Sequence, residues 1–116
     1  MVLVGTSVWI SHLRDGSEEL SALLDADAVV CHPFVIGELA CGNLTNRAEI
    51  VSLLRALPQA SVATQDEVLA FIEARHLAGT SLGYIDVHLL ASAVMTGVPL
   101  WTLDKRLNEA ALGEDA

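Results

Sequence analysis

The chain has 116 residues, a length typical of one hydrophobic core, and we expect a single domain over residues 1–116. Apolar residues make up 53% of it, yet no apolar run approaches the roughly 20 residues that a membrane-spanning helix needs. The formal net charge of −9, from 15 acidic and 6 basic side chains, disfavours a broad electrostatic grip on nucleic acid. Composition therefore predicts a soluble protein and argues against a general RNA-binding module.

Short buried strands alternate with amphipathic helices along the chain, which is typical of a three-layer α/β/α fold with a mainly parallel sheet. The opening run Val2–Val4 predicts the central strand, and Gly5 followed by the hydroxyls of Thr6 and Ser7, two good helix caps, predicts a turn into a short helix. Further strands are expected at Ala28–Cys31, Ser61–Ala63 and Leu100–Leu103, the last of them beside the central strand. Further helices are expected from Ser17 onward and at Phe34–Ala40, Arg47–Leu57, Thr64–Ala78, Tyr84–Thr96 and Asp104–Ala111.

The cysteines and histidines follow no pattern that indicates chemistry. Cys31 and Cys41 lack a ligand spacing such as Cys-x-x-Cys, and the N-terminus lacks the features of a secretory signal. We therefore expect two reduced cysteines, buried in the core of a cytoplasmic protein. The histidines share no spacing, so core or surface positions are expected for all of them: His12, His32, His76 and His88.

Three acidic residues occupy positions with both a structural and a functional explanation. Glu38 lies in an apolar run, where a buried carboxylate needs a partner or a metal, although a solvent-facing helix position explains it equally well. Asp86 lies in the first turn of an expected helix, where the helix dipole stabilises any acid. Asp104 follows an expected strand, at a position where an aspartate commonly caps the next helix. Because Asp104 and Gly5 both follow strand ends, and helices carrying the other two acids can flank that edge, one cleft can collect all three carboxylates.

Four segments of the chain carry a family resemblance: Val2–Ile10, Val35–Ala40, Gly83–Ala93 and Leu100–Leu107. In their order and spacing, over nearly the whole chain, they resemble the PIN-domain ribonuclease toxins of the VapC family. The resemblance implies the toxin of a toxin–antitoxin system, a divalent-metal-dependent endoribonuclease that cleaves structured RNA such as tRNA or rRNA. It also implies a homodimer and a cognate antitoxin whose C-terminal segment lies in a groove near the active site. The family fold usually adds an edge strand, for which Gly113–Ala116 offers nothing apolar.

The resemblance makes Glu38, Asp86 and Asp104 the catalytic carboxylates and the ligands of Mg²⁺ or Mn²⁺, ions that prefer oxygen donors. The implied reaction is phosphodiester hydrolysis, in which the metal polarises the phosphate and generates hydroxide from bound water. A negatively charged protein is compatible with this reaction, because carboxylates gathered around divalent cations present a neutral or positive face to a phosphate.

Four neighbouring residues have supporting roles in this interpretation. Thr6 and Ser7 support the acidic cluster with their hydroxyls, unless Thr6 serves only as a helix cap. Lys105 and Arg106 lie next to Asp104, and they either meet RNA phosphate or are simply solvated.

One position departs from the family pattern, because Gly5 stands where the family has its first aspartate. Glycine offers no ligand, so we expect weak activity or none, while the fold and the partner surface persist. A natural loss and an engineered inactivation both fit the sequence. The alternative function is a catalytically inactive PIN-fold scaffold that only binds a protein partner. A receiver domain is excluded, since the paired acids after the first strand and the phosphoacceptor after a middle strand are both missing.

Overall fold

The structure is a computed structural model that describes residues 1–113. Three parallel strands form its sheet in the order β2-β1-β3, with β1 (Val2–Val4) in the centre, β2 (Val29–Val30) on one side and β3 (Leu100–Trp101) on the other. Leu3 pairs with Val30 and with Leu100. The predictions of a central N-terminal strand and of its C-terminal neighbour are therefore confirmed.

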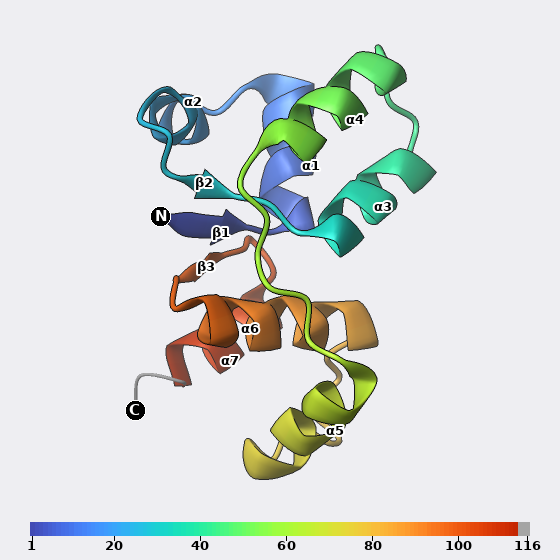
Figure 1. Cartoon of the computed structure of the whole chain (residues 1–116), viewed down its shortest axis with the longest axis vertical. Coiled ribbons are helices and arrows are strands. Elements are labelled where there is room, and N and C mark those ends of the chain that lie inside the picture. The colour runs from blue at the N-terminus through green and yellow to red at the C-terminus, as the bar shows by residue number, and fades with distance from the viewer. Residues whose placement is uncertain (114–116) are drawn as a thin grey trace.

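Helices cover both faces of this sheet (Figure 1). In Figure 1 the helices α1 to α4 lie on one side of the strands, α6 and α7 lie on the other, and α5 lies beyond α6. The helices are α1 (Thr6–Asp15), α2 (Glu18–Asp25), α3 (Pro33–Cys41), α4 (Arg47–Ala56), α5 (Gln65–Ala74), α6 (Tyr84–Thr96) and α7 (Lys105–Gly113). The predicted three-layer α/β/α architecture with a parallel sheet is confirmed.

The buried core explains the high apolar content of the chain. Leu3 and Val4 of β1 are completely buried between the two helical layers, as expected for a strand covered on both faces. Helix α6 is buried over seven consecutive residues, Val87–Ala93. Each fully buried Leu or Val side chain contributes about 1.5–3 kcal/mol relative to an exposed one, so β1 and α6 are the parts of the fold that hold the two layers together.

Local chemistry sets several helix boundaries. Thr64 and Glu67 form a capping box at the start of α5, with each side chain accepting a hydrogen bond from the backbone of the other. Helix α6 ends at Gly97, which takes the left-handed conformation (φ 77°) that favours glycine. Helix α5 ends at Ala74, before the expected Ala78, because His76 takes a left-handed φ of 55° and the chain turns there.

Two predictions about the backbone are wrong. Ser61–Ala63 forms no strand; the chain instead makes an isolated parallel bridge two residues earlier, where Gln59 pairs with Cys31. Ala63 is buried against α6 and therefore serves packing rather than strand pairing. Thr6 and Ser7 are not helix caps, because the N-cap of α1 is Gly5 and no side chain caps that position.

The cysteine prediction holds for one of the two residues. Cys31 is buried, and this burial raises the pKa of its thiol to about 11. Cys41 is exposed, contrary to the expectation of a core position, because it lies in the last turn of α3. Both thiols are free.

The predicted loss of the family's last edge strand concerns Gly113–Ala116, of which residues 114–116 lie outside the described residues. Within residues 1–113, no strand pairs with the outer edge of β3. No helix in this part of the chain has the length and apolar character needed to cross a membrane.

Candidate active site

An acidic pocket of about 230 Å³ lies at the edge of the sheet where β1 and β3 end. We call it the acidic pocket because the three predicted carboxylates line it together. Its lining residues are Gly5, Thr6, Ser7, Ile10, Glu38, Asp86, Leu89, Thr102, Asp104 and Leu107. The expectation that parallel strands and flanking helices bring Glu38, Asp86 and Asp104 to one place is met by this geometry.

Glu38 reaches the pocket from α3. Its side chain is exposed, so of the two explanations of its position the solvent-facing helix position is the correct one. It is nevertheless held in place, because Thr6 Oγ1 donates a hydrogen bond of 2.7 Å to Glu38 Oε1. Thr6 therefore contacts one of the acids directly from the first turn of α1.

Asp86 reaches the pocket from the first turn of α6, where it is half-buried. Burial raises the pKa of its carboxyl, and the nearby charges of Asp104 and Glu38 raise it further, whereas a hydrogen bond from the Gly83 backbone acts in the opposite direction. The pocket thus holds negative charge that is incompletely compensated. A bound cation would relieve this repulsion.

Asp104 is both a pocket residue and a helix cap. Its Oδ1 accepts a hydrogen bond of 3.0 Å from the backbone N–H of Leu107, which places Asp104 at the N-cap of α7. Both explanations of this residue therefore apply, since the cap fixes the carboxylate at the pocket. Lys105 and Arg106 follow on the exposed start of α7 and do not line the pocket.

A pair of hydroxyls holds the loop that carries Asp104. Thr102 Oγ1 lies 3.3 Å from Ser7 Oγ and accepts a hydrogen bond of 3.1 Å from the backbone N–H of Asp104. Ser7 Oγ accepts another of 2.9 Å from the backbone N–H of Leu103. Thr102 is buried and was not among the predicted site residues; the available indication was a hydroxyl within an apolar run, two positions before the acid.

Gly5 lies at the floor of the same pocket in an extended conformation (φ −75°, ψ 165°) that any residue adopts. A Cβ at this position would lie 3.1 Å from the Trp101 carbonyl oxygen and 3.6 Å from Thr102 Cβ. An aspartate therefore needs no unusual backbone angles, but the edge of β3 must move by a few tenths of an ångström to admit it.

The donor atoms of the pocket fit a hard divalent cation, because carboxylate and hydroxyl oxygens are the ligands that Mg²⁺ and Mn²⁺ prefer. Within residues 1–113, no three acidic, histidine or cysteine side chains are grouped closely enough to hold a metal as they stand. Glu38 is instead bonded to Thr6, and Gly5 contributes no carboxylate. The oxygen donors of the acidic pocket are thus of the right type for a divalent cation, but the set of ligands is incomplete.

The histidines are absent from the lining of the acidic pocket in the described chain. His32 and His88 are buried, and burial lowers the pKa of both, to about 4 for His32, where the nearby His88 lowers it further. His88 Nδ1 has no hydrogen-bond partner among the described residues. The expected structural roles of these two histidines agree with their positions.

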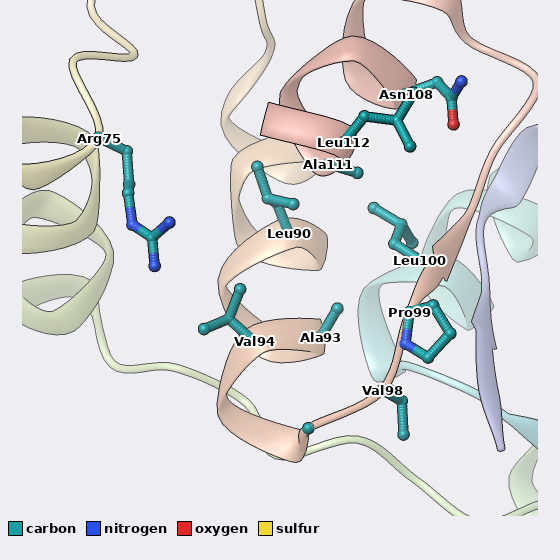
Figure 2. A pocket seen from close by; sticks show the side chains of 11 residues that line it. Arg75, Leu90, Ala93, Val94, Val98, Pro99, Leu100, Asn108, Ala111 and Leu112 are labelled. Atoms are coloured by element: carbon teal, nitrogen blue, oxygen red, sulfur yellow. The ribbon is translucent and has the colours of Figure 1, made fainter. Parts of the chain in front are cut away.

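A second hollow, of about 430 Å³, lies between α6, β3 and α7 (Figure 2). Figure 2 shows that its walls are mostly apolar side chains such as Leu90, Val98 and Leu100, with Arg75 at one side. Its lining in the described part of the chain includes no carboxylate. The chemistry of the molecule therefore concentrates at the smaller acidic pocket.

Comparison with known proteins places the chain in a family. The family model described as PIN domain matches residues 2–112. Ribonuclease VapC32 of Mycobacterium tuberculosis, in the strains CDC 1551 / Oshkosh and ATCC 25618 / H37Rv, is 49% identical over 111 residues, which cover 95% of this chain and 90% of the relative. These matches agree with the four segments that carry the resemblance in the sequence. The chain therefore belongs to the PIN-domain family and, within it, to the VapC ribonucleases.

Proposed function

We propose that the chain is the toxin of a toxin–antitoxin system, a divalent-metal-dependent endoribonuclease whose catalytic power is reduced by Gly5. The observation that carries this proposal is the convergence of Glu38, Asp86 and Asp104, from three separate elements, on one pocket. The raised pKa of Asp86 supports it, because burial and then the charges of Asp104 and Glu38 disfavour the ionised carboxyl, and a bound cation would offset both effects. The ribonuclease name of the relatives supports the choice of RNA as substrate.

In the proposed mechanism Glu38, Asp86 and Asp104 would hold Mg²⁺ or Mn²⁺ in the acidic pocket, beside which the scissile phosphodiester would bind. The ion, when bound, supplies Lewis-acid polarisation of the phosphate and a water of lowered pKa. Thr6 fixes one oxygen of Glu38 through its 2.7 Å hydrogen bond. Asp104 is positioned by the hydroxyls of Ser7 and Thr102, which hold the loop that precedes it.

The basic residues Lys105 and Arg106 are proposed to attract RNA phosphate. Both are exposed at the start of α7, directly after Asp104, so their charges lie next to the acidic pocket. The net charge of −9 leaves little general attraction for RNA elsewhere on the molecule. Structured RNA, such as tRNA or rRNA, is the proposed substrate class.

The second candidate function is an inactive PIN-fold scaffold that only binds a protein partner. The specific observation in its favour is Gly5, which removes a potential ligand from the floor of the pocket. The two functions differ in metal affinity. A scaffold shows no Mn²⁺ binding even when an acid is restored at position 5.

The test is RNA cleavage by matched preparations of the original chain, Gly5→Asp and Gly5→Ala, with and without EDTA. The alanine variant is the control, because its Cβ makes the same 3.1 Å approach to Trp101 without adding a carboxylate. We expect cleavage by Gly5→Asp that EDTA abolishes, and Mn²⁺ affinity raised on the order of 10-fold or more. Equal activity in all three would show that position 5 is not a ligand position, and inactivity in all three would favour the scaffold.

As the resemblance implies, we propose a cognate antitoxin and a second copy of the chain as partners. We also propose a cytoplasmic location, on the ground of the two free cysteines. An apolar groove of about 420 Å³, which we call the α1–α3 groove, is the proposed antitoxin site. It is continuous with the acidic pocket, since both include Ile10 and Glu38. Ile10 and Leu13 expose apolar surface in it, and the negative charge of the chain suits a basic segment.

A further inference from the structure

Four aromatic rings form a continuous row between α3 and α6. The ring centroids of Tyr84 and His88 lie 4.6 Å apart, those of His88 and Phe34 lie 4.7 Å apart, and those of Phe34 and His32 lie 5.0 Å apart. Every pair is arranged edge to face, the geometry that aromatic quadrupoles favour. The row begins in the core and ends at the surface with Tyr84.

The inner end of the row is rigidly anchored. The backbone N–H of Phe34 donates to His32 Nδ1 at 2.9 Å, so the proton of the neutral ring is on Nε2, which lies 3.0 Å from Ser92 Oγ. His32 and Ser92 are completely buried. Because each ring packs on the one before it, the orientation of Tyr84 is fixed from within.

The outer end of the row is open. Tyr84 is 48% exposed, although its ring packs against the buried His88. An edge-to-face contact with an interplanar angle of 88° covers at most one face of the tyrosine ring. Tyr84 therefore has nearly half of its surface open to solvent, and its ring rests on a fixed support.

The row of rings spans the two helices that carry two of the proposed catalytic carboxylates. Tyr84 lies in the same first turn of α6 as Asp86, and Phe34 lies one helical turn before Glu38 on the same side of α3. The row of rings therefore connects the two helix segments from which these acids reach the acidic pocket. Tyr84 and the acidic pocket thus share the start of α6, which is the ground for expecting a base of a pocket-bound nucleotide to meet Tyr84.

We propose that Tyr84 is a base-stacking residue, on which an unpaired base of the RNA substrate stacks beside the scissile phosphate. The proposal rests on the proposed ribonuclease function and adds a recognition residue to it. Stacking of unpaired bases on aromatic side chains is a principal mode of single-stranded RNA recognition. It matters more than usual here, because a chain with a net charge of −9 gains little affinity from general phosphate attraction.

The test measures binding in Mn²⁺, which the acidic pocket needs in order to hold a phosphate, and gel electrophoresis confirms that the RNA stays intact during the titration. The full chain is titrated into a single-stranded RNA that carries the fluorescent base 2-aminopurine, and stacking is read from the quenching of that base. Tyr84→Leu removes the aromatic face, and Tyr84→Phe is the matched control that retains it. We expect Tyr84→Leu to bind roughly 10-fold more weakly with its quenching lost, and Tyr84→Phe to match the original chain.

The salt dependence separates stacking from charge. Tyr84→Leu should weaken binding equally at all salt concentrations, whereas Lys105→Ala should reduce the slope of affinity against salt. Unchanged binding by Tyr84→Leu, equal weakening in Tyr84→Phe, or absence of RNA binding by the original chain would each overturn the proposal. If the proposed ribonuclease function is wrong, the Gly5→Asp variant shows no metal-dependent cleavage. That result comes from a separate assay, so the two failures are distinguishable. Circular dichroism confirms that each variant is folded before binding is compared.

Discussion

At the scale of single residues, the site is defined by carboxylates that repel one another. Asp86 lies between two other acids, and both its burial and their charges raise its pKa. Because folding raises the pKa, the folded protein retains this proton to a higher pH than the unfolded chain does. The contribution of Asp86 to stability is therefore fully present below its ordinary pKa and is lost as the pH rises through the raised value.

We predict that Asp86→Asn is more stable than the original chain at neutral pH, because the amide removes the repulsion. The difference in melting temperature should shrink as the pH falls toward the ordinary carboxyl value of 3.8. Thermal unfolding as a function of pH measures it, with the exposed Glu73→Gln on α5 as control. Lower stability of Asp86→Asn at neutral pH would contradict the prediction. Added Mn²⁺ should stabilise the original chain more than Asp86→Asn, since an ion bound to the folded state shifts the equilibrium.

Some residues of the site were visible in the sequence and others were not. Glu38, Asp86 and Asp104 were predicted to share a pocket because the ends of parallel strands meet at one edge of the sheet. Thr102 was not identified, because threonine in a strand is also an ordinary β-forming residue. The close approach of Trp101 to Gly5 depends on the spacing of β1 and β3, which no sequence pattern specifies.

At the scale of elements, one buried hydrogen bond joins the two helical layers. His32 follows β2, Ser92 lies in the middle of α6, and both are completely buried. The Nε2–H of His32 donates to Ser92 Oγ at 3.0 Å, as the tautomer fixed by the Phe34 N–H requires. Removing one partner of a buried hydrogen bond leaves the other with an uncompensated desolvation cost.

We predict that Ser92→Ala lowers the free energy of unfolding by about 1–3 kcal/mol, because it leaves the His32 N–H buried and unpaired. Ser52→Ala is the matched control, since Ser52 is exposed on α4 and its change should stay within about 0.5 kcal/mol of zero. Urea unfolding of the two variants measures both values. Equal stability of Ser92→Ala and the original chain would show that another group, or a water molecule, satisfies His32.

The predicted helix ends were accurate where a glycine marks the end of the helix and inaccurate where it does not. Helix α6 has the predicted bounds, Tyr84–Thr96, because Gly83 and Gly97 mark both of its ends. Helix α5 is shorter than predicted, because its end depends on a left-handed histidine instead of a glycine. Leu53 of α4 and Leu69 of α5 are exposed although apolar, since these short helices are covered over only part of their apolar side.

At the scale of the whole molecule, the net charge and the exposed apolar surface both favour binding of a partner protein. The net charge is −9, and the α1–α3 groove exposes apolar side chains next to the acidic pocket. A partner segment that is both basic and apolar matches this combination. Occupation of the groove would also restrict access to the acidic pocket, because the two hollows share Ile10 and Glu38.

We predict that Leu13→Asp weakens antitoxin binding at least 10-fold, because a charge in the α1–α3 groove must be desolvated when an apolar side chain of the partner packs there. Leu13 is 37% exposed, so the variant should fold with little loss of stability. The matched control is Leu112→Asp, which introduces the same charge at an exposed site in α7, in the opposite helical layer. Co-expression with the cognate antitoxin, followed by light scattering, measures complex formation and the mass of the free chain. Equal weakening in both variants would place the partner elsewhere, and retention of the complex by Leu13→Asp would exclude this groove as the principal contact.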